Sequence, residues 1–278
     1  MRKQSEFLIR RSHRQTENYF FGFNRNATHA VIIMTKVRLV PVNNAIELNK
    51  LFTAAKTCYS AKSPIDIFDE EKDLVEVEDF VNGKIEVGHV SVIEHTHLTF
   101  LIEGVSRALT HQLVRHRLCN YSQQSQRYVK LDRIENWNES GEYFVIPPSI
   151  LNNDAALKEY SHLMKEASDC YKRLVLLGIR SEDARFVLGN GCQTNIVMTV
   201  NLRELIHICN ERLCSAAQWE IRNLVSEMKK CVVEQLPFML ICYGVLAALK
   251  GLSEQGCNGP VTEAINKIER HLNVQAHK

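Results

Sequence analysis

The stretch Thr96–Glu103 (THLTFLIE) has an apolar side chain at every second position. Because successive side chains of a β-strand point to opposite faces, this alternation predicts a half-buried strand whose buried face is made by Leu98, Phe100 and Ile102. The segment that follows, Val105–Arg117, has apolar residues four positions apart, which predicts a helix. A strand that leads at once into a helix indicates a sheet with helices packed against it.

The rest of the chain is expected to continue this arrangement. Two further short strands are expected at Val37–Pro41 and Tyr143–Ile146. The segment Ala61–Glu71 is interpreted as a loop, because Ser63-Pro64 interrupts it. The expected helices are Asn43–Tyr59, Asp73–Val81, Asn152–Leu177, Ser181–Leu188, Asn201–Gln218, Glu220–Leu236 and Val261–Leu272. Strands in the first half and helices in the second predict an α+β fold, with helices packed on a mixed or antiparallel sheet.

Charge and pattern divide the chain into three parts. Residues 1–34 are rich in arginine and lack a clear period, so we expect a disordered basic extension. A transit peptide, or a start codon assigned upstream of the true one, are alternatives for this segment. A compact domain is expected over residues 35–240 and a C-terminal helical tail over residues 241–278.

The composition indicates an ordinary globular protein. The formal net charge of +2 is too small to indicate nucleic-acid binding by itself. There is no apolar run of about 18 residues, so no transmembrane helix is expected. The nine cysteines form no paired CxxC motifs. An odd number of cysteines without a secretory signal favours reduced thiols and a cytoplasmic location.

The segment between Glu103 and Asp132 contains no acidic residue and carries the clearest chemical signal. Its cationic and titratable side chains are Arg107, His111, Arg115, His116, Arg117, Arg127 and Lys130. A cluster of one sign in a nearly neutral protein indicates an anion site. The spacing of four between Arg107, His111 and Arg115 is expected to place all three on one face of the predicted helix.

The side chains that follow this helix suit a phosphorylated pyrimidine. Arginine binds phosphate oxygens through two parallel hydrogen bonds. Cys119–Gln126 is rich in hydroxyl and amide groups, which both donate and accept as the imide edge of a pyrimidine requires. Two other interpretations stay open at this point. A solvated basic face would account for Arg107 and Lys130, and basic polar segments also bind nucleic acid.

A longer pattern narrows this choice. Arg115-His116-Arg117, then seven residues, then Ser125 resembles the signature of flavin-dependent thymidylate synthases, the ThyX family. Gly88–Phe100 (GHVSVIEHTHLTF), Asp183–Leu188 (DARFVL) and Val200–Arg222 resemble further segments of that family. The resemblance extends from about residue 35 to about residue 237, and it implies the ThyX-like α+β fold.

The resemblance implies a reaction and its partners. It implies methylation of dUMP to dTMP, with 5,10-methylenetetrahydrofolate as carbon donor and NADPH as reductant through FAD. No enzyme cysteine attacks the uracil in this family, and Cys119, inside the motif, is expected to have a packing role. The chain has no Gly-x-Gly-x-x-Gly loop, so a flavin must be held by a non-Rossmann arrangement. The family also implies a homotetramer with active sites shared between subunits, and no nucleic-acid or membrane partner.

The resemblance assigns roles to individual residues. Catalytic roles are implied for Arg115, Ser125 and Arg212. Cofactor-binding roles are implied for Ser91, Glu94, Arg115, His116, Arg117, Gln123, Asn201, Arg203 and His207. Substrate-binding roles are implied for His89, Gln112, Arg115, Gln123, Gln124, Ser125, Gln126, Arg127, Arg185 and Arg212. No metal site is implied.

Two residues raise specific expectations. Ser125 is expected to position the substrate, because no histidine–acid pair is evident that would activate it as a nucleophile. Arg212 lies nine residues beyond Arg203, about half a turn round a helix, so the two arginines are expected to serve two different pockets. The chain departs from the family pattern at Cys58, Gly189 and Ala216, and a member that has lost catalysis is an alternative.

Overall fold

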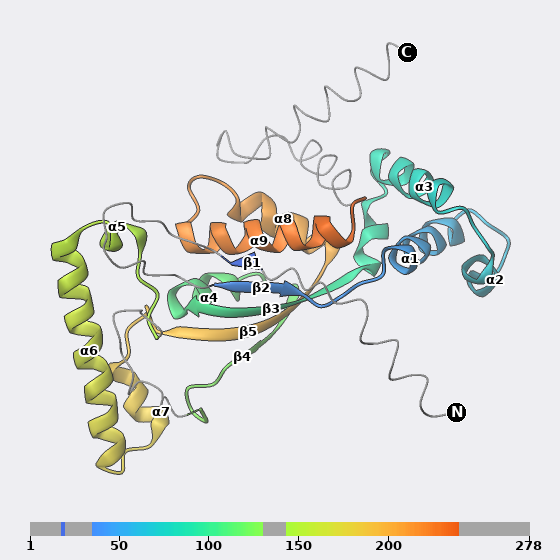
Figure 1. Cartoon of the computed structure of the whole chain (residues 1–278). Coiled ribbons are helices and arrows are strands. Elements are labelled where there is room, and N and C mark those ends of the chain that lie inside the picture. The colour runs from blue at the N-terminus through green and yellow to red at the C-terminus, as the bar shows by residue number, and fades with distance from the viewer. Residues whose placement is uncertain (1–17, 20–34, 130–142, 239–278) are drawn as a thin grey trace, which may run out of the picture.

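The computed structural model describes residues 18–19, 35–129 and 143–238 (Figure 1). The tail over residues 241–278, with the expected helix Val261–Leu272, lies outside these residues, as does nearly all of the basic extension. In the described part, helices lie along one face of a single sheet, and further helices stand at its two ends (Figure 1). The predicted α+β fold is therefore confirmed.

The sheet has five strands in the order β1-β2-β3-β5-β4, and every neighbouring pair is antiparallel. The strands are β1 (Asn18–Tyr19), β2 (Lys36–Leu39), β3 (His97–Ser106), β4 (Cys119–Gln123) and β5 (Gln193–Asn201). The strands predicted from Val37 and Thr96 correspond to β2 and β3. The predicted strand Tyr143–Ile146 is wrong, since this segment forms one isolated bridge between Phe144 and Cys192.

Strand β5 was not predicted, although it is central to the sheet. It pairs with β3 on one side and with β4 on the other. Its side chains alternate between buried and more exposed positions, with Thr194, Ile196, Met198 and Val200 buried. The expectation that strands are confined to the first half of the chain is therefore wrong. The alternation of apolar and polar residues in this segment is hard to recognise in the sequence, because polar residues stand at both of its ends. The burial of every second side chain shows it clearly.

The buried face of the sheet forms one apolar core with the helices that cover it. Leu98, Phe100 and Ile102 of β3 are each at most 1% exposed, as predicted. They share a cluster with the buried side chains of β5 and with helices α8 (Leu202–Arg212) and α9 (Trp219–Gln235). Because truncating such side chains costs about 2–5 kcal/mol each, this cluster fixes which face of the sheet the helices cover.

One end of the sheet carries three short or medium helices and a 3₁₀ turn. These are α1 (Asn44–Thr57), α2 (Pro64–Asp69), α3 (Leu74–Glu86) and η1 (Val90–His95). The loop predicted over Ala61–Glu71 is wrong in part, because Ser63 caps α2 and Pro64 occupies its first turn, where proline is favoured. Helix α3 continues past its predicted end at Val81, and the chain turns at Gly88 with φ of 90°.

Helix α4 (Arg107–Leu113) is shorter than predicted at both ends. Val105 belongs to β3, whose register shifts between Ile102 and Val105, and Ser106 caps the helix. The carboxylate of Glu220 in α9 accepts the backbone N–H and the hydroxyl of Ser106, at 2.7 and 2.5 Å. The expectation that Arg115 shares a helical face with Arg107 is wrong, because the helix ends at Leu113.

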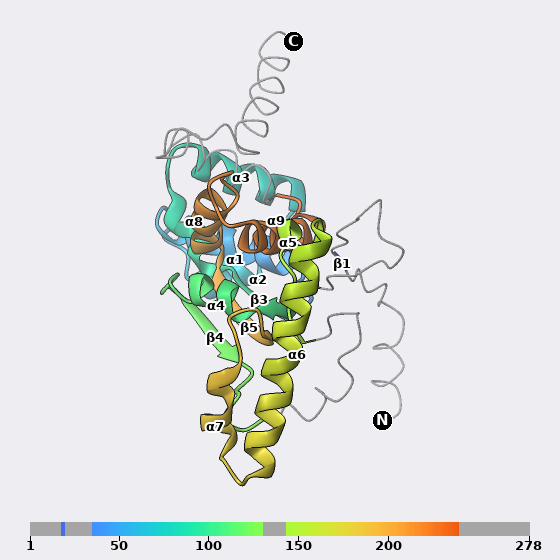
Figure 2. The same ribbon diagram turned by 90° about the vertical axis from the view of Figure 1, so that its left-hand side faces the viewer.

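The other end of the sheet carries an arm of helices (Figure 2). It contains α5 (Pro148–Leu151), α6 (Asp154–Leu176), α7 (Ser181–Ala184) and the 3₁₀ turn η3 (Arg185–Val187). Helix α7 packs beside the far part of α6. Among the described residues, no helix is long and apolar enough to cross a membrane.

Candidate active site

The signature segment forms a tight turn followed by an edge strand. Arg115, His116 and Arg117 lie in the turn between α4 and β4, with Arg115 and Arg117 exposed and His116 only 5% exposed. The hydroxyl group of Tyr121, on β4, donates to the carbonyl oxygens of Leu113 and His116, at 2.8 and 3.1 Å. Tyr121 thereby fixes the turn against the strand that follows it.

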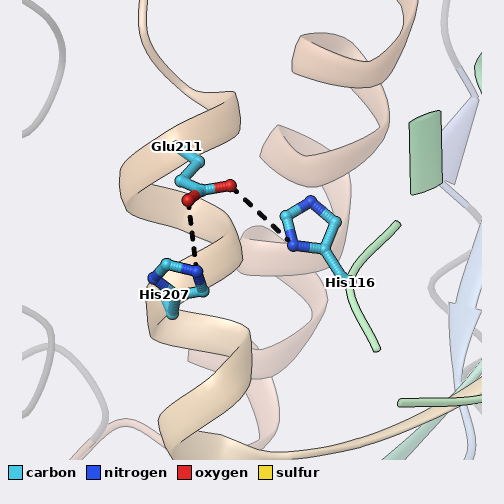
Figure 3. Close-up of side chains that lie close together, drawn as sticks. All are labelled: His116, His207 and Glu211. Atoms are coloured by element: carbon cyan, nitrogen blue, oxygen red, sulfur yellow. Dashed lines mark ion pairs between the residues drawn. The ribbon is translucent and has the colours of Figure 1, made fainter. Parts of the chain in front are cut away.

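His116 connects this turn to helix α8. Its Nε2 accepts a hydrogen bond from Nε of Arg212 at 3.0 Å. Its Nδ1 lies 3.9 Å from a carboxylate oxygen of Glu204 and 3.9 Å from one of Glu211. Glu211 also contacts Nε2 of His207, at 3.2 Å, so its carboxylate lies between the two histidines (Figure 3). We call these five residues the His116 cluster.

The protonation of His116 follows from its surroundings. Burial lowers the pKa of His116, the charge of Arg212 and His207 lowers it further, and Glu211 raises it. A neutral imidazole that accepts from Arg212 at Nε2 carries its proton on Nδ1. That N–H then faces the two glutamates. His116 is therefore fixed in one tautomer as well as in position.

The His116 cluster also has the composition of a metal site. His116, His207 and Glu211 offer ligand atoms within 4.8 Å of one another. A metal-bound imidazole needs a free lone pair on the ligating nitrogen. In His116 the lone pair on Nε2 is used by Arg212, and Nδ1, which faces Glu211, carries the proton. We therefore interpret the cluster as a network joined by the Arg212–His116 hydrogen bond and by contacts of the two histidines with glutamate side chains.

Helix α8 also positions residues at its N-terminus. The side chain of Asn201 caps the helix by accepting from the backbone N–H of Glu204 at 2.9 Å. Arg203 pairs with Glu94 of η1. Arg203 and Arg212 therefore have different partners, in line with their predicted separation. Nearby, Nε2 of His89 lies 3.2 Å from the hydroxyl group of Tyr59.

A second group of polar residues gathers between α7 and the segment that follows β4. Nε of Arg127 pairs with the carboxylate of Glu182 at 2.9 Å, and Arg180 pairs with the same carboxylate. Nε of Arg185 donates to the backbone carbonyl of Glu182 at 3.1 Å. We call these four residues the arginine cluster. The structure thus brings Arg127 and Arg185 together, although 58 positions separate them in sequence.

Arg107 lies close to the arginine cluster. Its Nη2 donates to the backbone carbonyl of Gln124 at 2.9 Å, and its Nε is buried. Burial lowers the pKa of Arg107, the thiol of Cys192 raises it, and the charge of Arg185 lowers it. Arg107 is therefore half-buried rather than fully solvated, while Lys130, for which the same alternative was considered, lies outside the described residues.

The two clusters lie at opposite ends of the central strands. Cys119, close to His116, pairs with Val200, whereas Nε2 of Gln126 contacts the thiol of Cys192 at 3.3 Å. Eight residues separate Cys192 from Val200. At about 3.4 Å per residue, this stretch spans about 27 Å.

The comparisons with known proteins agree on one family. A model of the family described as "Thymidylate synthase complementing protein" matches residues 44–238. The chain belongs to this family. A flavin-dependent thymidylate synthase from Geobacter sulfurreducens is 44% identical over 179 residues, which cover 64% of this chain and 74% of the relative. Another, from Nitratidesulfovibrio vulgaris, is 38% identical over 221 residues, which cover 75% of this chain and 87% of the relative.

A solved structure supports the fold assignment. The UMP/dUMP methylase PolB from Streptomyces cacaoi, bound with 5-Br dUMP, resembles this chain with a TM-score of 0.61 and 22% sequence identity. The match covers 77% of this chain and 95% of that chain. The range matched to the thymidylate synthase complementing protein family contains every predicted site residue and both clusters.

The remaining predicted site residues of this family member lie on α4, on β4, in the segment after β4 and in η1. Nε2 of Gln123 donates to the hydroxyl of Thr110 at 3.0 Å, and Gln112 is half-buried on α4. Ser125 accepts from the backbone N–H of Arg127 at 3.2 Å, and no described histidine contacts it. Ser91 lies exposed in η1. Gln124 is exposed, and its backbone N–H donates to the carbonyl of Asn195.

Several residues of the two clusters, together with Tyr121, were not among the predicted site residues. Glu204 and Glu211 flank His207 at three and four positions along α8, a spacing that helical periodicity alone can detect. Glu182 has no comparable signal, because its partner Arg127 lies 55 positions away. Tyr121 lies inside the signature, but its hydrogen bonds to the turn form only because strand β4 places its side chain beside that turn.

Proposed function

We propose that this member of the thymidylate synthase complementing protein family is a flavin-dependent thymidylate synthase. It converts dUMP to dTMP, with 5,10-methylenetetrahydrofolate as carbon donor and NADPH as reductant through FAD. The observation that carries this proposal is the contact of the Arg115–Arg117 turn with α8 through His116 and Arg212. That contact joins the signature to the second segment of family resemblance. Relatives that are 44% and 38% identical are named for this activity.

The residues around the His116 cluster fit a flavin nucleotide. Arg115 and Arg117 are exposed on either side of His116, and none of the ion pairs within residues 35–129 and 143–238 occupies their guanidinium groups. Arg203, which pairs with Glu94, adds a third arginine on the helix that the turn contacts, and arginines suit a pyrophosphate. When bound, FAD would carry electrons from NADPH to the one-carbon unit. The protein holds the flavin and orients it.

No cysteine of the signature is suited to attack the uracil. Cys119 packs against the apolar core, as expected. Burial raises the pKa of its thiol to about 11, so the thiol is protonated at neutral pH. This agrees with a mechanism that uses no enzyme cysteine nucleophile.

The proposed substrate-binding residues fall into groups with different chemical roles. Arg127 and Arg185 supply guanidinium groups for the 5′-phosphate of dUMP, while Gln112 and Gln123 supply amides for the uracil edge. Arg115 supplies positive charge where negative charge develops on the ring during transfer. Ser125 positions the loop that carries Arg127, through its hydrogen bond to the Arg127 backbone.

The distance between the two clusters supports an oligomer with shared sites. About 27 Å of strand separates the contacts of Gln126 from those of Cys119, which is far longer than one nucleotide. Arg127 and Arg212 of one chain are therefore too far apart to hold one dUMP molecule together. We propose that a complete site combines Arg127 of one subunit with Arg212 of another, within a homotetramer.

Two measurements test the proposed function. The purified protein should bind FAD and turn yellow, and NADPH should bleach the flavin absorbance. The wild type should release tritium from dUMP labelled at C5, and Arg115→Ala should abolish the release while the protein still binds FAD. Arg38→Ala, at an exposed position of β2, is the matched control and should retain activity.

The outcomes separate the alternatives. A protein that takes up no FAD contradicts the proposal as a whole. A protein that binds FAD and dUMP but releases no tritium is the family member without catalysis. Full activity of the Arg115→Ala variant contradicts the role of Arg115 alone.

A further inference from the structure

In the described part of the chain, Glu182 is the acidic residue at the centre of the arginine cluster. Its carboxylate binds Arg127 and Arg180, and its backbone carbonyl accepts from Arg185. The hydrogen bond from Arg127, together with the charges of Arg180 and Arg185, lowers the pKa of the Glu182 carboxyl. Glu182 is therefore ionised at neutral pH.

The positive charge at this position exceeds the negative charge. Two guanidinium groups pair with the one carboxylate, a third donates to the backbone carbonyl of the same residue, and Arg107 adds a fourth cation that acts on Arg185. The side chain of Arg127 is 52% exposed, so an anion from solution can reach it. A local excess of positive charge at an accessible position favours a further anion.

A carboxylate and a phosphate compete for the same face of an arginine. Both present oxygen atoms that accept parallel hydrogen bonds from one guanidinium group. We infer that the carboxylate of Glu182 holds Arg127 in the nucleotide-free protein, and that the 5′-phosphate of dUMP displaces it from Arg127. Glu182 is thus an affinity-determining residue that opposes substrate binding. This inference rests on the proposed function, in which Arg127 binds the phosphate.

The size of the effect is limited by the exposure of the pair. Ion pairs between solvent-exposed side chains change an equilibrium constant by only about two- to fivefold. Removing the charge of Glu182 should therefore tighten nucleotide binding by about two- to fivefold. A residue that served only to orient Arg127 for the phosphate would have the opposite effect, because its removal would weaken binding.

The test is a calorimetric titration of the FAD-loaded protein with dUMP, for wild type and Glu182→Gln. The variant should bind dUMP about two- to fivefold more tightly. Its KM for dUMP should fall by the same factor, with kcat unchanged. Asp183→Asn is the matched control, because Asp183 is an exposed acid next in the chain that makes no ion pair in the described structure. It should change dUMP affinity by less than Glu182→Gln does.

The outcomes distinguish this inference from the proposed function. If the wild type fails to bind dUMP, the proposed function is wrong. If the wild type binds dUMP but Glu182→Gln binds it equally or more weakly, the competition by Glu182 is refuted. An equal gain of affinity in Asp183→Asn would also refute it, because a general loss of negative charge would then explain the result.

Discussion

His116 shows how the fold sets the chemistry of a single side chain. The imidazole is almost fully buried, and the guanidinium group of Arg212 donates to its Nε2. Protonation at Nε2 would break that hydrogen bond and place two cations in contact. The pKa of His116 is therefore lowered, with burial as the largest cause. The hydrogen bond that links the turn to α8 forms only while Nε2 of His116 is unprotonated.

This state predicts a dependence of stability on pH. The ordinary pKa of histidine is about 6.5, and the folded protein holds His116 below it. The contribution to stability is complete above about pH 6.5 and is lost as the pH falls towards the pKa of the folded state, because the unfolded chain then binds a proton that the folded chain resists. The unfolding free energy should fall by up to about 1.4 kcal/mol per pH unit in this window.

Urea denaturation between pH 7.5 and 5 measures this slope. His116→Asn should flatten it, and His162→Asn is the matched control, because His162 is exposed on α6. An equal slope in wild type and His116→Asn would contradict the assignment.

At the scale of residues, the sequence predicts the relative positions of side chains that belong to the same helix or strand. The spacing of Arg203 and His207 along α8 follows from helical geometry, and Asn201 lies at the capping position of that helix. The contact between His116 and Arg212 joins positions 96 apart, and no local pattern contains it. The resemblance to a family supplied both residues, but only the folded chain shows that they bond to each other.

At the scale of elements, the turn between α4 and β4 is held by the strand that leaves it. The hydroxyl group of Tyr121 bonds to two carbonyl oxygens of the turn, and burial raises the pKa of Tyr121 far above its ordinary value. The phenol is thus a permanent donor. It determines the conformation in which Arg115 and Arg117 are presented.

Tyr121→Phe should therefore affect both stability and flavin binding. Losing the hydroxyl removes the donor for two backbone carbonyls, which should cost about 1 kcal/mol of unfolding free energy. The looser turn should also raise the Kd for FAD, measured by quenching of flavin fluorescence. The matched control is Tyr160→Phe, because the hydroxyl of Tyr160 on α6 bonds to the carbonyl of Val145, away from the turn. It should lower stability similarly and leave FAD affinity unchanged; an equal loss of affinity in both variants would contradict the role of Tyr121.

The elements themselves were predictable where one periodicity dominates. The alternation in β3 and the long pattern of α6 were both predicted correctly in type. Helix α2 was missed because Ser63-Pro64 was interpreted as a break, although the same pair begins a helix. The start of α4 depends on Glu220, which is 114 positions from Ser106. Local patterns carry no information on such a bond.

At the scale of the whole molecule, the sheet separates the two clusters to which the proposed function assigns one substrate. Strand β5 contacts the arginine cluster region at its start and the His116 cluster region at its end, about 27 Å apart. Both clusters lie in the range matched by the family. The proposed function therefore requires that one site take the arginine cluster from one subunit and the His116 cluster from another.

This geometry predicts that two inactive variants restore activity when they form mixed oligomers. Arg127→Gln and Arg212→Gln should each lack thymidylate synthase activity alone. In a mixed oligomer, a site that takes Arg127 from the second variant and Arg212 from the first contains both arginines. The two proteins are co-expressed with different tags and purified through both. Each of the two arginines comes from the variant that retains it in about half of the sites, so about a quarter of the wild-type activity should return. A mixed oligomer without activity would show that one subunit supplies both arginines. Mixing Arg127→Gln with Arg115→Ala tests in the same way whether Arg127 and the Arg115 of the signature turn come from different subunits.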